Sequence, residues 1–71
     1  MKEYAAIIEK TTTGWSAYAP DLPGLGVAGS TFDATEQLIR DGIEFHIEGL
    51  LRDGEPVPEP TTRVARMLIS A

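Results

Sequence analysis

The 71-residue sequence contains no cysteine, which excludes three kinds of chemistry at once. No disulfide can staple the fold, no thiolate can act as a nucleophile, and no cysteine-based zinc site can form. Basic residues are also scarce: six Lys and Arg stand against eleven Asp and Glu, which gives a net charge of −5. Because binding to a phosphate backbone needs clustered basic side chains, no direct DNA binding is expected from this chain.

A long hydrophobic run is missing as well. The apolar stretch at residues 4–8 is far shorter than a membrane span or the core of a signal peptide. We therefore expect no membrane association and a cytoplasmic location.

The length of 71 residues limits what the chain can bury. A folded chain of this mass exposes roughly 4,300 Å², against roughly 11,000 Å² unfolded, so about 61% of the surface is buried. One small core is possible, whereas two domains or a large parallel sheet are not. Small domains without staples often gain stability by association, so we expect a homodimer or homotetramer built through the sheet edge or the helix face.

Three short strands are predicted in the first half of the chain. Residues 4–9 form an apolar run, and residues 15–19 and 25–29 alternate in polarity or size. Gly14 closes a hairpin loop between the first two strands, because glycine readily adopts a positive φ. The pattern predicts a three-stranded antiparallel meander.

A long helix follows, where the apolar spacing changes from two to three and four residues. Ser30 or Thr31 can cap its first turn, and Asp33 gives Ser30 the spacing of a capping box. Gly54 is a plausible stop, so the helix is expected to span roughly 21 residues. The residues of its apolar side are Phe32, Ile39, Ile43, His46, Ile47, Leu50 and Leu51.

The end of the chain predicts a last strand. Residues 55–60 hold three alternate prolines and form an extended connector, and residues 62–69 are rich in Val, Met, Leu and Ile. The predicted fold class is α+β, with order β-β-β-α-β and one long helix packed on one face of the sheet. A last strand lying parallel to the first would make a right-handed crossover.

No catalytic or metal site is predicted. His46 is the single histidine and sits at the edge of the apolar stripe, where a structural role is the usual one. Nuclease chemistry would need carboxylates that converge near strand ends, but Asp33 and Glu36 suit a helix N-terminus and Asp21 suits a turn. We therefore expect no enzyme activity, no metal and no cofactor.

Two glycines inside the predicted helix allow two interpretations. Gly42 and Gly49 each cost about 1 kcal/mol relative to alanine, and they lie nearly on one face with Phe45. Either the helix packs closely on the sheet at these positions, or another subunit approaches there.

A family resemblance rests on the segment Gly-Trp-Ser-Ala-Tyr-Ala-Pro-Asp-Leu-Pro-Gly at residues 14–24. It resembles the signature of the HicB family of antitoxins. The residues ahead of the helix, the helix text at 38–50 and the segment 53–60 are similar to the family too, so that the likeness covers roughly residues 2–60. The resemblance implies a single HicB-like domain over residues 1–71, with a partial ribonuclease-H-like fold and no nuclease activity.

The resemblance also implies a partner. Family members bind the HicA toxin, a small basic protein that cleaves mRNA, and block its active site; an acidic chain suits such a partner. Many family members carry a DNA-binding domain after the last strand, for which residues 1–71 leave no room. Autoregulation would then need another protein.

Two further functions stay open beside a toxin-neutralising antitoxin. The chain could be an orphan oligomeric binding protein of the same fold with no cognate toxin, or a carboxylate-dependent nuclease. Aromatic residues dominate interfaces, and an exposed apolar edge is expected around the second strand and the loop after it. The candidate partner or oligomer interface consists of Trp15, Tyr18, Asp21, Leu22, Pro23, Phe45 and Gly49.

Overall fold

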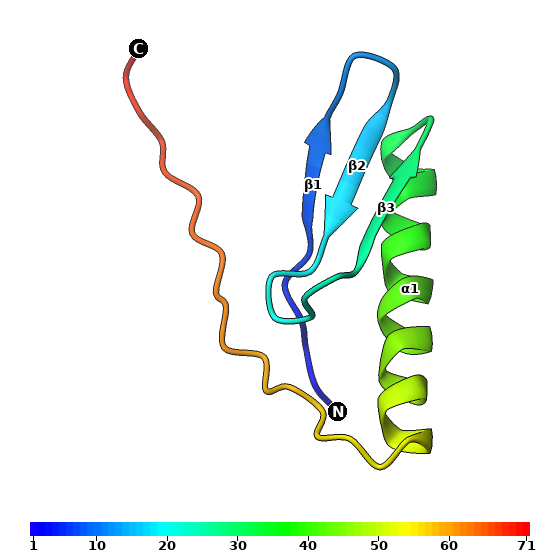
Figure 1. Ribbon diagram of the computed structural model, residues 1–71. Helices are drawn as coiled ribbons and strands as arrows, with labels where there is room; N and C mark the ends of the chain where they lie inside the picture. Colours follow the sequence, from blue (N-terminus) through cyan, green and yellow to red (C-terminus); the bar gives the residue numbers. More distant parts are fainter.

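The computed structural model describes residues 1–71, and its sheet has three antiparallel strands (Figure 1). They are β1 (Ile7–Lys10), β2 (Trp15–Tyr18) and β3 (Gly26–Gly29), in the order β1-β2-β3. Ile7 lies opposite Tyr18, and Tyr18 lies opposite Gly26. The predicted antiparallel meander is therefore confirmed.

The hairpin between β1 and β2 closes at Thr11 and Gly14. The Thr11 N–H donates to the Gly14 carbonyl at 2.8 Å, and the Gly14 N–H donates to Thr11 Oγ1 at 3.0 Å. Gly14 is buried, and a Cβ there would collide with the carbonyl oxygen of Gly29. The loop therefore needs glycine for close approach of the backbone, where the sequence suggested a positive φ.

β1 begins three residues later than predicted. Beyond the pair Ile7 and Tyr18, the opposite chain turns: the Leu22 N–H donates to the Ala19 carbonyl at 3.0 Å. Pro20 in this turn has no N–H to donate to a ladder. Residues 4–6 are consequently left without a strand partner.

The helix α1 (Phe32–Arg52) has 21 residues and matches the predicted length. Of the two predicted caps, Thr31 is the one used: its Oγ1 accepts from the Ala34 N–H at 3.1 Å. Gly54 ends the helix at φ 69°, and the Glu55 N–H donates to the Leu50 carbonyl at 2.9 Å, which is a Schellman ending. α1 is not apolar enough along its length to cross a membrane.

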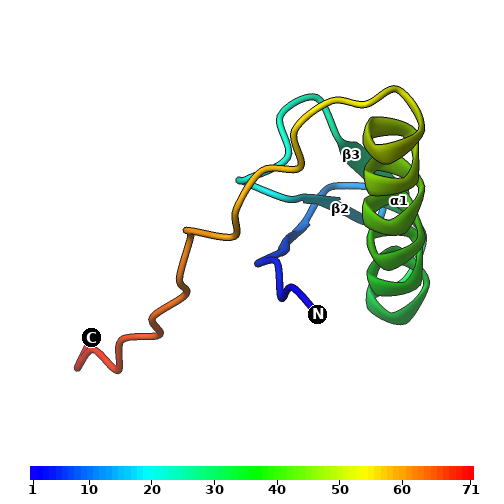
Figure 2. The ribbon, with the colours of Figure 1, turned by 90° about the horizontal axis from the view of Figure 1, so that it is seen from below.

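α1 lies on one face of the sheet, nearest to β3 (Figures 1 and 2). A Cβ on Gly42 would meet Leu25 Cδ1 at 3.1 Å and Val27 Cγ1 at 3.8 Å, so this glycine lets the helix approach the strand closely. Near the helix start, the buried Thr35 fills the space that a side chain on Gly29 would need. The buried hydrophobic residues are Ala17, Ala19, Leu22 and Ile39.

The predicted last strand is wrong. Residues 55–71 contain no helix or strand, and residues 63–71 run away from the body as an extended segment (Figures 1 and 2). We call residues 63–71 the C-terminal arm. No hydrogen bond joins the arm to the rest of the chain, so the arm forms no strand although its β-branched and aliphatic residues favour one. The observed order is β-β-β-α.

Candidate interaction surface

The face of the sheet opposite α1 is open, and Tyr18 lies on it. Strand side chains alternate, and Ala17 turns inward with 3% exposure while Tyr18 is 45% exposed. Its cross-strand neighbours on this face are Ile7 and Gly26. Gly26 offers no side chain to cover the phenol ring. Tyr18 is therefore an exposed aromatic side chain on the sheet face formed by Ile7, Tyr18 and Gly26, which we call the outer face.

Trp15 is on the opposite side of β2 from Tyr18 and is half-buried. Its ring meets Phe32 edge-on, with centroids 5.4 Å apart, and the Lys10 Nζ lies 5.1 Å from the ring centroid. These contacts are of the kinds that stabilise aromatic groups within a fold. Trp15 and Tyr18 therefore do not share one surface.

Asp21 is engaged within the chain. Its carboxylate accepts from the Thr62 N–H at 2.9 Å, from Thr62 Oγ1 at 2.8 Å and from Thr61 Oγ1 at 3.2 Å. The hydrogen bonds from the Thr62 backbone and side chain lower the pKa of Asp21 below its ordinary value. Asp21 thus ties the β2–β3 loop to the base of the C-terminal arm. No sequence pattern indicated this contact across some forty residues.

The two residues after Asp21 differ in accessibility. Leu22 is 0% exposed and supports the loop from inside. It therefore does not belong to the exposed apolar edge in which the sequence placed it. Pro23 is exposed and precedes Gly24, which turns the chain at φ 86°. Of this pair, Pro23 alone can touch a partner.

Phe45 and Gly49 lie on α1, away from the core. Phe45 is 73% exposed, and a Cβ on Gly49 would meet nothing closer than Nη2 of Arg52, at 3.5 Å. Close helix–sheet packing therefore explains Gly42 but not Gly49. A shallow depression of about 260 Å³ lies here and is lined in part by Phe45, Gly49 and the half-buried His46.

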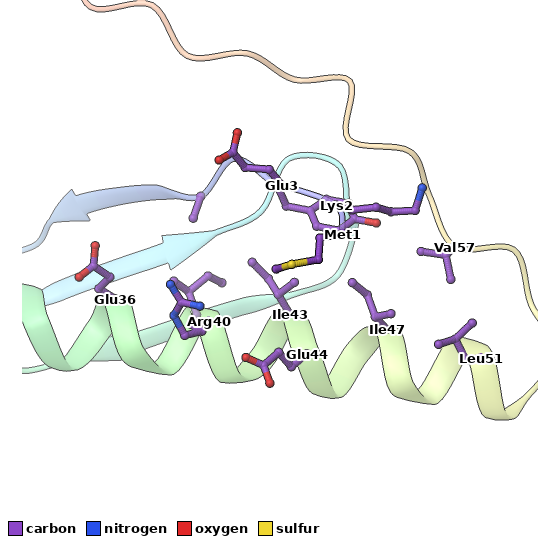
Figure 3. A pocket seen from close by; sticks show the side chains of 13 residues that line it. Met1, Lys2, Glu3, Glu36, Arg40, Ile43, Glu44, Ile47, Leu51 and Val57 are labelled. Atoms are coloured by element: carbon purple, nitrogen blue, oxygen red, sulfur yellow. The ribbon is translucent and has the colours of Figure 1, made fainter.

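A larger groove runs between the N-terminal segment and α1 (Figure 3). Its volume is about 920 Å³, and Ile43, Ile47 and Leu51 line its helical side. In Figure 3 Ile43 points from α1 toward Met1, and Leu51 lies on the side of Val57. No sequence pattern indicated this groove, although the apolar stripe of the helix that forms one of its walls is visible in the sequence. The full lining is Met1, Lys2, Glu3, Tyr4, Ala6, Glu36, Ile39, Arg40, Ile43, Glu44, Ile47, Leu51 and Val57.

Negative charge is concentrated on the body of the molecule. Residues 1–62 hold all eleven acidic residues but four of the six basic ones, so their net charge is −7. Asp21 is half-buried, and every other carboxylate is exposed. The shortest ion pair joins Lys2 and Glu59 at 2.8 Å, and this hydrogen bond raises the pKa of Lys2. The body therefore presents an acidic surface with little internal neutralisation.

Nowhere in the chain do three or more His, Asp or Glu side chains lie close enough together to hold a metal ion. Of the carboxylates considered for nuclease chemistry, Asp21 is engaged by Thr61 and Thr62, while Asp33 lies in the first turn of α1. The arrangement offers binding surfaces: the outer face with Tyr18, the helix surface with Phe45, and the groove.

The family is shown by comparison with known proteins. The HicB-like antitoxin family of bacterial toxin–antitoxin systems matches residues 4–69 of this chain. The match covers nearly the whole sequence, including residues 63–69 of the C-terminal arm. The chain belongs to the HicB-like antitoxin family, and the resemblance noted from residues 14–24 is confirmed.

Two relatives give the extent of the similarity. An uncharacterized 14.9 kDa protein from the rep-hol intergenic region of Haemophilus phage HP1 is 39% identical over 56 residues, which is 79% of this chain and 42% of that protein. A UPF0150 protein of Synechocystis is 37% identical over 57 residues, 79% of this chain and 72% of that protein. The chain thus spans less than half of the phage protein. No solved structure matches.

Proposed function

We propose that this chain is a non-enzymatic antitoxin that binds and neutralises a small basic, mRNA-cleaving toxin of the HicA type, acting as one domain over residues 1–71 in the cytoplasm. The match to the HicB-like antitoxin family over residues 4–69 is the observation that carries the proposal. The net charge of −7 on residues 1–62 supports it, because opposite charges speed the encounter with a basic protein and disfavour wrong partners.

Within this proposal the outer face is the toxin-binding surface. Tyr18 is its exposed aromatic residue, and aromatic side chains at the centre of an interface carry much of the binding energy. Pro23, Phe45 and Gly49 are further residues that a partner can reach. Trp15 and Asp21 support the binding surface indirectly. Trp15 packs against Phe32, and Asp21 accepts a hydrogen bond from Thr62.

The test pairs two variants of nearly equal exposure on different surfaces. Tyr18 is 45% exposed on the sheet and Leu38 is 43% exposed on α1. Tyr18→Ala should raise the dissociation constant for a HicA-type toxin at least about tenfold, whereas Leu38→Ala should leave it unchanged. Calorimetric titration of the toxin with each purified variant gives both values. Equal effects of the two substitutions would place the binding surface elsewhere.

A second candidate function is an orphan oligomeric binding protein of the same fold without a toxin. The exposed apolar residues of the C-terminal arm support self-association as a homodimer or homotetramer. Co-expression of this chain with a HicA-type toxin distinguishes the two functions. Restored growth and intact mRNA support the antitoxin; continued mRNA cleavage supports the orphan.

A further inference from the structure

The C-terminal arm leaves its large apolar side chains exposed. Val64, Met67 and Ile69 are 61%, 74% and 73% exposed, and Leu68 is 102% exposed. In an extended chain Ala65, Met67 and Ile69 would share one face, because side chains alternate along a strand. From residue 65 to residue 71 that face is apolar, and its one charged residue, Arg63, lies at the base of the arm. The opposite face carries Val64, Arg66, Leu68 and Ser70.

The body of the molecule offers a place for such a strand. β1 (Ile7–Lys10) is hydrogen-bonded to β2 alone, so its other edge has unpaired backbone groups. The groove of about 920 Å³ begins beside this strand, since Tyr4 and Ala6 line it together with α1 (Figure 3). A strand added to the free edge of β1 would place one row of side chains over the groove.

The arm does not fill this place within its own chain. Tyr4 donates to the Pro58 carbonyl at 2.6 Å, and Asp21 holds Thr61 and Thr62, so the connector is fixed where the arm leaves the body. Residues 61–71 contain no glycine or proline that would favour a sharp turn back toward β1. Figure 2 shows the arm pointing away from the sheet.

The exposed surface measures what the single chain leaves uncovered. The chain exposes 5630 Å², whereas a compact chain of 7.7 kDa exposes roughly 4,300 Å². The difference of roughly 1,300 Å² exceeds the 800 Å² or so that each partner buries in a standard interface. The radius of gyration, 13.7 Å, is also above the value of about 11 Å for a compact chain of this length.

We propose that two copies of this chain exchange their arms: residues 63–71 of each copy add as a fourth strand to the free edge of β1 in the other, with Met67 and Ile69 over the groove. The exchange is reciprocal, so one two-fold axis satisfies both edges and both arms. Charge favours it as well, because the arm carries Arg63 and Arg66 and the body it would meet has a net charge of −7. This inference rests on the self-association part of the proposed function and is independent of toxin binding.

The contact is tested by mixing isotope-labelled and unlabelled copies of the full chain and recording isotope-filtered NOEs. We expect a dimer by light scattering at micromolar concentration, and NOEs between the Met67 methyl of one copy and Tyr4 or Ile43 of the other. A monomer would overturn the exchange and self-association while leaving toxin binding intact. A dimer whose arm NOEs arise within one copy, or are absent, would overturn the exchange alone.

A matched pair of variants tests which face of the arm is used. Met67→Lys should weaken dimerisation at least about tenfold because a charge would enter the apolar groove, whereas Leu68→Lys should have little effect. Both side chains are largely exposed in the single chain, so neither substitution should unfold it. Equal dimer dissociation constants for the two variants would contradict the proposed orientation of the arm.

Discussion

At the scale of single residues, Gly14 has no room for a side chain. A Cβ there would collide with the Gly29 carbonyl and lie 3.3 Å from Ser30 Cα, both of them backbone atoms. Gly14→Ala should therefore lower the free energy of unfolding by about 1–3 kcal/mol. Gly26→Ala is the control, since its Cβ would lie 3.8 Å from the nearest atom, the Ala17 carbonyl oxygen. Urea denaturation at one fixed protein concentration compares them, and equal stability of the two variants would contradict the close contact.

Asp21 makes the attachment of the arm dependent on pH. Because the pKa of Asp21 is lowered in the folded chain, its contribution to stability is fully present above the ordinary pKa of 3.8 and is lost as the pH falls through the lowered value. The stability difference between the wild type and Asp21→Asn should be constant at neutral pH and shrink below about pH 4. Denaturation at a series of pH values measures it. A difference that does not shrink as the pH falls below the ordinary pKa of 3.8 would show that the Asp21 charge has no role.

Burial at the residue scale was only partly predictable. Trp15 and Tyr18 alternate on β2 as the sequence indicates, yet the same pattern did not reveal that Leu22 is fully buried. The burial of Leu22 depends on the turn from Ala19 to Leu22, which directs the Leu22 side chain inward. The partner of Asp21 depends on the path of the connector, which no local pattern encodes.

At the scale of elements, the start of α1 depends on one hydroxyl group. The sequence allowed Ser30 or Thr31 as the cap, and the Ala34 N–H donates to Thr31 Oγ1. Thr31→Ala should lower the free energy of unfolding by about 1 kcal/mol. Ser30→Ala should change it by less than about 0.5 kcal/mol, as at an ordinary surface position. Thermal unfolding followed by circular dichroism measures both, and a larger effect at Ser30 would identify it as the cap.

The elements were predictable where local signals agree. The periodic stripe, the cap and Gly54 define α1, and Gly14 defines the first hairpin. The absence of a last strand could not be predicted. Residues 62–69 have the composition of a strand, but composition does not tell whether the segment reaches a sheet edge with which it can pair. In this chain the free edge of the sheet is that of β1, and the arm does not pair with it.

For the molecule as a whole, charge should govern the rate of association with the toxin. Residues 1–62 carry a net charge of −7, and this charge is largely on exposed side chains. The association rate constant with a basic HicA-type toxin should fall as salt rises, with a smaller change in the dissociation rate constant. Surface plasmon resonance at several salt concentrations measures both rate constants. An association rate independent of salt would mean that the acidic body does not steer the encounter.

Inhibition of RNA cleavage tests the proposed antitoxin activity. A purified HicA-type toxin is incubated with mRNA and increasing amounts of the 71-residue chain. We expect cleavage to cease at stoichiometric amounts of the chain, with Tyr18→Ala requiring a large excess. Undiminished cleavage at saturating amounts of the folded wild-type chain would contradict the antitoxin function.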